Sequence, residues 1–188
     1  MRFLHAIVAT LAVLGTAAAV SASTVQLLSN DDLVARSTSI VRGKVLSESG
    51  MLRRSTIYTN YKFQVTEVLK GTANAQIDVA VPGGVAQGLR EIVSGAPRLQ
   101  VGTEYVLFLW TSQSGLTQIL GLAQGLFLSI QQADGTLLAV RPGGSDATLV
   151  DLKTGKKTAD GGAQMAVSDI RNRVKALPAG SAAKSGLK

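Results

Sequence analysis

The stretch IYTNYKFQVTEVLKG, residues 57–71, constrains the fold of this chain more than any other segment. Its first half places an apolar residue at every second position: Tyr61, Phe63 and Val65. That two-residue period is typical of a β-strand with one buried face. The period breaks at Glu67, and the next apolar residue is Val68. An extra residue at Thr66–Glu67, a β-bulge, would bend the strand and return Val68 to the core face.

Several shorter segments are also strand-like, and they occupy residues 39–46, 76–81, 118–122, 126–130, 136–140 and 148–152. Residues 105–110 are apolar on both faces, which predicts a central strand that is covered on each side. Gly43 falls on the apolar face of the first segment and indicates a bend or a close approach of two backbones. Many short strands joined by turns predict a mainly β fold. We expect an OB-like barrel of five to seven strands.

Two helices are expected to flank the strands. The first spans residues 29–36, with Ser29 or Asn30 as its N-cap and acidic residues in its first turn. The second is an amphipathic helix at about residues 163–177, which ends before Pro178. Residues 179–188 are small and polar and are predicted to form a disordered tail. The pattern therefore predicts one barrel domain over residues 23–178.

The first 22 residues have the composition of a secretory signal peptide. One cation, Arg2, precedes the apolar run 3–14, and Val20-Ser21-Ala22 fits the small-residue pattern before a cleavage point. An uncleaved membrane anchor is the alternative, but the apolar run is shorter than the ~20 residues that a spanning helix needs. We expect cleavage after Ala22, a new N-terminus at Ser23 and no later transmembrane segment. The prediction is a secreted or periplasmic bacterial protein.

Cleavage would also remove the only histidine, His5, and the chain has no cysteine. A histidine base, a cysteine nucleophile and a zinc site built from these residues would then be impossible. Paired carboxylates can act without histidine, and four acids are candidates: Glu67, Asp78, Glu91 and Glu104. Nothing in the sequence brings two of them together, and Glu67 could instead pair with Arg42 or Lys44. We therefore predict a non-enzymatic protein with no catalytic residue, no cofactor and no metal site.

The chain is basic, with 19 lysines and arginines against 12 acids. Such a charge can attract nucleic acid, lipopolysaccharide or anionic lipid, and it can also simply keep a protein in solution. The residues considered for a basic binding face are Arg42, Lys44, Arg53, Arg54 and Lys62, with further lysines at 153, 156 and 157. Few aromatic residues are free to stack bases, because most occupy positions expected in the core.

Five segments together resemble a family of uncharacterised exported bacterial proteins: IVRGKVLSES, IYTNYKFQVTEVLKG, IDVAVPGG, GTEYVLFL and GLAQGLFLSI. The most specific part is SGAPRLQVGTEYVLFLW followed by GLAQGLF. The resemblance covers residues 33–130 and ends before the expected C-terminal helix. It implies export from a bacterial cell and carries no assigned activity.

The order of features is also similar to the netrin-like module of tissue inhibitors of metalloproteinases. There, a strand of the form I-V-x-G-x-V leads to a long strand ending in x-V-x-x-V-x-K-G, as residues 40–45 and 64–71 do here. The resemblance implies a five-stranded OB-type barrel. Those inhibitors use disulfides and an N-terminal cysteine that chelates the target's zinc, whereas this chain has no cysteine and would begin at Ser23. No inhibitory residue can therefore be transferred to it.

Together these features predict a secreted binding or accessory module of the bacterial envelope. Its partner would be an unknown protein, and a secreted protease is one candidate. The alternative is a polyanion-binding module that uses the basic face and loses affinity steeply as salt is added. An enzyme that uses paired carboxylates is the least favoured function.

Overall fold

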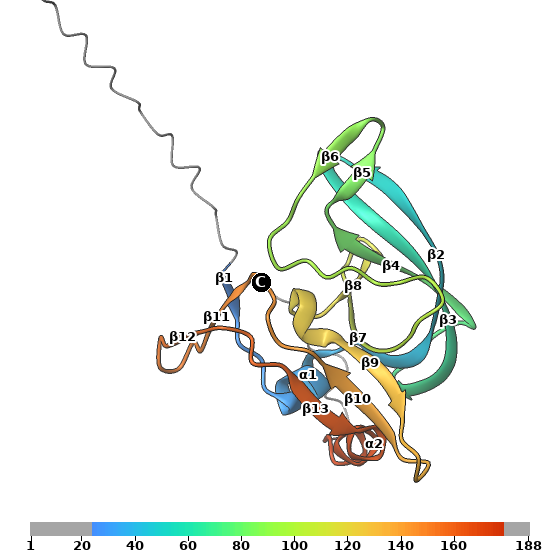
Figure 1. The fold of residues 1–188 in the computed structure, drawn as a ribbon, viewed down its shortest axis with the longest axis vertical. Coiled ribbons are helices and arrows are strands. Elements are labelled where there is room, and N and C mark those ends of the chain that lie inside the picture. The colour runs from blue at the N-terminus through green and yellow to red at the C-terminus, as the bar shows by residue number, and fades with distance from the viewer. Residues whose placement is uncertain (1–23, 179–188) are drawn as a thin grey trace, which may run out of the picture.

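The computed structural model describes residues 24–178. The expected signal peptide, Ser23 and the tail at 179–188 lie outside these residues. A seven-strand antiparallel sheet curls into a half-barrel (Figure 1), and this confirms the predicted mainly β, OB-like fold. The sheet order is β13 (Ala163–Ala166), β10 (Leu137–Arg141), β9 (Leu126–Gln131), β7 (Glu104–Thr111), β2 (Ser39–Arg53), β3 (Thr56–Lys70) and β4 (Gln76–Pro82).

Smaller elements extend or cover this sheet. β8 (Thr117–Ile119) pairs with β7 as a side branch, and β5 (Gly84–Ala86) and β6 (Leu89–Glu91) form a separate hairpin. A second small sheet contains β1 (Thr24–Gln26), β11 (Thr148–Val150) and β12 (Lys157–Thr158). The helical elements are α1 (Asn30–Arg36), α2 (Val167–Lys175) and the 3₁₀ turn η1 (Leu122–Gly125). None of the helices within residues 24–178 is long and apolar enough to cross a membrane.

Two apolar layers pack on opposite faces of the sheet. The helix-side layer joins α1 and α2 to the sheet, and its largest buried side chains include Leu33, Phe108 and Phe127. The loop-side layer includes Tyr61, Phe63 and Leu107, and Leu99 from a covering loop completes it. β7 supplies Val106 and Phe108 to the first layer and Tyr105, Leu107 and Leu109 to the second. The prediction of a central strand covered on both faces is therefore confirmed.

The predicted bulge in β3 is present. Arg42 of β2 pairs with Glu67, and the next residue, Gly43, pairs with Val65, so that Thr66 is the extra residue. A methyl group on Gly43 would lie 1.9 Å from the carbonyl oxygen of Gln64, which explains why this position has no side chain.

The predicted burial of Val68 is wrong. Val68 pairs with the buried Val41, as the shift of phase requires, but it remains 42% exposed. The pairing of β4 with β3 stops at Gln64, and no further strand covers the end of β3 on that side. The bulge therefore turns Val68 to the predicted face of the strand, but it does not bury the side chain.

The helices begin and end with identifiable caps. Ser29 is the N-cap of α1, and its hydroxyl exchanges hydrogen bonds with Asp32 in a capping box. At the other end of α1, the buried ammonium of Lys70 donates to the carbonyl oxygens of Val34 at 2.6 Å and Ala35 at 2.9 Å. Burial lowers the pKa of Lys70. Lys70 thus fixes the end of β3 to the C-terminus of α1, where a cation is favoured.

Two expected elements have different boundaries. The C-terminal helix begins at Val167, because residues 163–166 form β13 and pair with β10. The segment expected to be a strand at 118–122 ends as a strand at Ile119, because Gly121 and Leu122 have φ angles of 66° and 57°. The 3₁₀ turn that follows places Gln124 in the core, where its amide accepts from the backbone N–H of Leu28 and donates to the carbonyl of Gln26.

Candidate functional site

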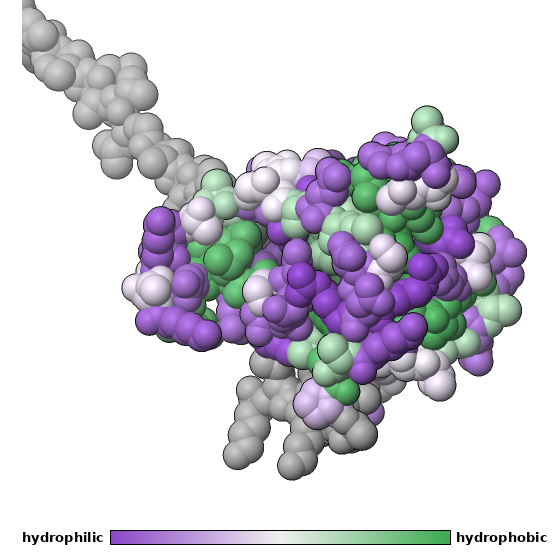
Figure 2. Space-filling view, turned by 90° about the horizontal axis from the view of Figure 1, so that it is seen from below, coloured by the Kyte–Doolittle hydropathy of each residue, from purple (hydrophilic) through white to green (hydrophobic). Residues whose placement is uncertain are grey.

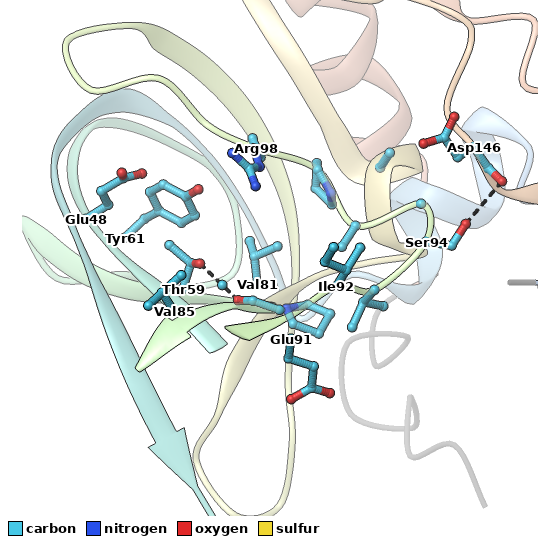
Figure 3. Close-up of a pocket in the computed structure, with 18 of the residues that line it drawn as sticks. Glu48, Thr59, Tyr61, Val81, Val85, Glu91, Ile92, Ser94, Arg98 and Asp146 are labelled. Atoms are coloured by element: carbon cyan, nitrogen blue, oxygen red, sulfur yellow. Dashed lines mark hydrogen bonds between the residues drawn. The ribbon is translucent and has the colours of Figure 1, made fainter. Parts of the chain in front are cut away.

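A cleft of about 940 Å³ lies at the open end of the half-barrel. It lies between the ends of β2, β3 and β4, the β5–β6 hairpin, the loop 91–98 and the segment 144–146 (Figure 3). We call it the rim cleft. A cleft of this size can hold a small molecule or a few residues of a peptide.

Glycines allow the β5–β6 hairpin to fold closely over the long β2–β3 ribbon. A methyl group on Gly50 would lie 1.8 Å from the carbonyl oxygen of Val85, and one on Gly84 would lie 2.3 Å from the Thr59 hydroxyl. The same hydroxyl donates to the carbonyl oxygen of Gly83 at 2.9 Å. These contacts hold one wall of the cleft against the sheet.

The loop 91–98 forms the opposite wall and is fixed at its first residue and near its middle. The carboxylate of Glu91 accepts a hydrogen bond from the backbone N–H of Ile57 at 2.7 Å. The Ser94 hydroxyl donates to the carbonyl oxygen of Asp146 at 3.3 Å, and Gly95 packs against Ala147. The loop therefore bridges the β2–β3 ribbon and the segment 144–146 (Figure 3).

Exposed apolar side chains stand at the mouth of the rim cleft. Val85 is 60% exposed and Ile92 is 77% exposed, and both line the cleft. Leu89, at the start of β6, is also 60% exposed. Large exposed apolar groups beside a hollow are typical of a surface that is covered by a partner.

Two opposite charges face the same space. Glu48 and Arg98 line the cleft, and neither makes an ion pair within residues 24–178 (Figure 3). The buried phenol of Tyr61 lies beside them and accepts from the backbone N–H of Leu99 at 3.4 Å. Burial raises the pKa of Tyr61, and the nearby Glu48 carboxylate raises it further. At neutral pH the cleft therefore holds a neutral phenol between a carboxylate and a guanidinium.

The four acids considered for catalysis have partners elsewhere. Glu67 accepts from Arg42 at 3.2 Å and from Arg171 of α2 at 2.6 Å, and Glu104 also binds Arg42. Glu91 binds the Ile57 backbone, as described above. Asp78 pairs with Lys62 at 3.4 Å on the surface. Glu67 and Glu104 thus bind the same arginine, Arg42, whereas Asp78 and Glu91 have other partners.

The electrostatics of Glu67 are those of a structural carboxylate. Partial burial raises its pKa, but hydrogen bonds from Arg171 and Arg42 outweigh that effect and hold the pKa below its ordinary value. A general acid at neutral pH needs a raised pKa instead. The suggested pairing of Glu67 with Arg42 is present, and we call Arg42, Glu67, Glu104 and Arg171 the Glu67 network.

The residues considered for a basic face differ in their surroundings. Arg42 belongs to the Glu67 network, Lys62 pairs with Asp78, and the guanidinium of Arg53 donates to the carbonyl oxygen of Ser114 at 2.9 Å. Arg54 occupies the β2–β3 turn with a φ of 56°, and Lys44 is exposed in β2. From below, the helical end of the molecule is mainly hydrophilic, with separate apolar patches (Figure 2).

No group of three metal-binding side chains occurs within the described residues. The chain matches no protein-family model, no curated protein and no solved structure. The rim cleft was not predicted from the sequence. The available signal was the combination of glycine-rich turns with the apolar residues Leu89, Ile92 and Val93 in a segment that lacks a clear strand or helix period.

Proposed function

We propose that this protein is an exported, non-enzymatic binding module of the bacterial envelope. In this proposal the rim cleft holds a short extended segment of a partner protein. The observation that carries the proposal is the exposure of Val85 and Ile92 at the mouth of a cleft that also contains unpaired charges. Apolar contacts would supply most of the affinity, and the charges would orient the bound segment.

The chemistry of the cleft supports binding rather than reaction. Four charged residues line it, the acids Glu48, Glu91 and Asp146 and the cation Arg98, and Glu91, the last residue of β6, is used to hold the loop. The two acids that share one arginine, Glu67 and Glu104, belong to the sheet near α2, where hydrogen bonds from Arg171 and Arg42 lower the pKa of Glu67. Neither arrangement supplies a base and an acid on the two sides of one substrate bond.

Export is supported by the leader-like residues 1–22 and by the absence of cysteine from the chain. The similarity to netrin-like modules makes a secreted protease one partner to test first. Because the N-terminal cysteine of those inhibitors is missing, binding through the rim cleft would be independent of zinc chelation.

Selection of linear peptides from a phage-displayed library would test this function. Peptides enriched on the wild-type protein should bind the Val85→Ser/Ile92→Ser variant at least tenfold more weakly, because two apolar contacts are lost. Arg98→Glu should select peptides of different charge. Leu152→Ser is the matched control, since it removes an exposed leucine far from the cleft in sequence and outside its lining.

Two results would contradict the proposal. One is a library from which no peptide is enriched on the folded wild-type protein. The other is a set of enriched peptides that bind wild type and the Val85→Ser/Ile92→Ser variant equally well. Circular dichroism of each variant would show that the fold is retained.

A further inference from the structure

A second exposed feature lies on the small β1–β11–β12 sheet, which projects from the side of the half-barrel (Figure 1). The turn between β11 and β12, residues 151–156, is held by its own backbone. The N–H of Asp151 donates to the carbonyl oxygen of Lys156 at 3.0 Å, and that of Gly155 donates to the carbonyl oxygen of Asp151 at 2.8 Å. The turn therefore presents its side chains on a defined support.

The Asp151 carboxylate forms hydrogen bonds within the same turn. It accepts from the backbone N–H of Lys153 at 2.8 Å and from that of Thr154 at 3.4 Å. These hydrogen bonds lower the pKa of Asp151, so the group is ionised and oriented toward the backbone at neutral pH. It does not form an ion pair with any lysine of the turn.

One large apolar side chain stands on this turn without cover. Leu152 is 69% exposed, whereas Leu149 on the preceding strand is 2% exposed. Leu152 belongs to neither apolar layer of the fold. The alternation of the strand thus anchors the hairpin through Leu149 and leaves Leu152 to the solvent.

Three exposed lysines lie close to that leucine in the chain: Lys153 and Lys156 in the turn, and Lys157 at the start of β12. None of them forms an ion pair within residues 24–178. Lys153 helps to lower the pKa of two acids, Asp151 of the same turn and Asp32 at the start of α1, although hydrogen bonds are the larger cause for both. Residues 151–157 carry three lysines and one acid, so their local charge is positive.

We infer that the β11–β12 turn is a contact site for an anionic phospholipid surface. Leu152 would enter the headgroup region, and the three lysines would lie against lipid phosphates. An apolar side chain flanked by cations is the arrangement that binds membrane interfaces. A nucleic-acid site would instead need side chains that stack on bases, and residues 148–158 contain no aromatic residue. This inference does not depend on the rim cleft.

Co-sedimentation of the full chain with vesicles tests the inference. The vesicles would contain equal parts of phosphatidylglycerol and phosphatidylcholine, and vesicles of phosphatidylcholine alone would be the comparison. Each lysine near an anionic surface contributes roughly a fivefold gain in partitioning. Lys156→Gln/Lys157→Gln should therefore lower binding to the anionic vesicles roughly 25-fold.

Matched variants separate the turn from the rest of the chain. Lys44→Gln/Arg90→Gln removes the same charge from exposed positions elsewhere and should change binding less than about twofold. Leu152→Ser should weaken binding several-fold, whereas Ile92→Ser should not, although Ile92 is the more exposed residue. The apolar run at residues 3–14 is present in every variant, so differences between variants report only on the substituted side chains.

Three outcomes would overturn the inference. The first is an equal loss of vesicle binding in both double variants, which would indicate general charge attraction. The second is a Leu152→Ser variant that binds as wild type does. The third is binding of a single-stranded oligonucleotide that Lys156→Gln/Lys157→Gln abolishes and Leu152→Ser leaves intact, which would make the turn a nucleic-acid site.

Discussion

The helical end and the rim cleft of this half-barrel use charged residues in opposite ways. At the helical end, buried or half-buried charges have partners: Lys70 caps α1, and Arg42 joins Glu67 to Glu104. The buried pair Arg141–Asp160, beside the segment 144–146, is likewise complete. Arg173 of α2 also binds Asp31 of α1. At the rim, Glu48 and Arg98 make no ion pair within residues 24–178, and large apolar side chains are exposed.

The difference shows which interactions stabilise the fold and which groups remain available for binding. Charges that are removed from water must be neutralised by a partner, so those of the helical end contribute to the stability of the folded chain. Charges and apolar groups that remain in water at the rim add little to stability and are available to a partner. Substitutions should therefore separate the two ends, with stability affected at one and binding affected at the other.

The largest effect is expected at the buried pair Arg141–Asp160, whose side chains are 8% and 1% exposed. Arg141→Met keeps an apolar contact with Phe127 but leaves the Asp160 carboxylate buried without a counter-charge. We expect a loss of about 3–5 kcal/mol in the free energy of unfolding, measured by urea denaturation. Arg98→Met at the rim should change it by less than about 0.5 kcal/mol. Equal losses would show that buried paired charges and the unpaired charges of the rim do not differ in this way.

Lys70→Met should have the next largest effect. The carbonyl oxygens of Val34 and Ala35 would lose a charged donor in a buried setting, and this should cost about 1–3 kcal/mol. Lys62→Met is the control, because the ion pair of Lys62 with Asp78 is more than half exposed and should be worth less than about 1 kcal/mol. A smaller loss for Lys70→Met than for Lys62→Met would contradict the assigned role of Lys70 as a helix cap.

The Glu67 network should make the fold sensitive to acid. The pKa of Glu67 in the folded protein lies below its ordinary value of 4.5. Its contribution to stability is therefore complete above that value and is lost as the pH falls through the lower folded pKa. Glu67→Gln should cost about 1 kcal/mol at pH 7 and should flatten the decline of stability below pH 4.5.

The pH profile of Glu67→Gln would be measured by urea denaturation beside Asp78→Asn. Asp78 lies in an exposed pair, so its variant should decline with acid as the wild type does. If both variants follow the wild-type curve, Glu67 does not stabilise the contact between α2 and the sheet through its charge.

The smallest effect on stability is expected at the rim. Ile92→Ser should change the free energy of unfolding by less than about 0.5 kcal/mol, because the side chain is 77% exposed. The same variant should lose the peptide binding proposed for the cleft. A loss of more than about 1 kcal/mol would instead place Ile92 among the residues that hold the loop in position.

Sequence patterns predicted the parts of the fold that depend on the local spacing of apolar residues. The alternation of Tyr61 and Phe63 and its break at Glu67 located the long strand and its bulge, because a change of face needs one extra residue. The apolar character of residues 105–110 located the central strand in the same way. The burial of Val68 was not predictable, since it depends on how far β4 runs along β3.

Long-range pairing and close backbone contacts explain the other differences. Residues 163–166 join the sheet because β10 offers a free edge, and the side chain of Met165 would suit a helix equally well. The rim cleft exists because Gly50 and Gly84 let one hairpin fold over another. The place where one hairpin folds over the other depends on φ angles and on atoms that are distant in sequence. The basic residues of the sequence gave no indication of the rim cleft.

The parallel pairing of β1 with β11 has a consequence for the order of folding. Thr24, at the start of the described residues, lies opposite Thr148, and nearly all of the sheet lies between them in the chain. Closing so long a loop costs entropy that only an already assembled body can offset. The β2–β3 ribbon can form early, whereas β1 must wait until residues 148–150 are available. The strand nearest the N-terminus within residues 24–178 is therefore expected to be among the last to fold.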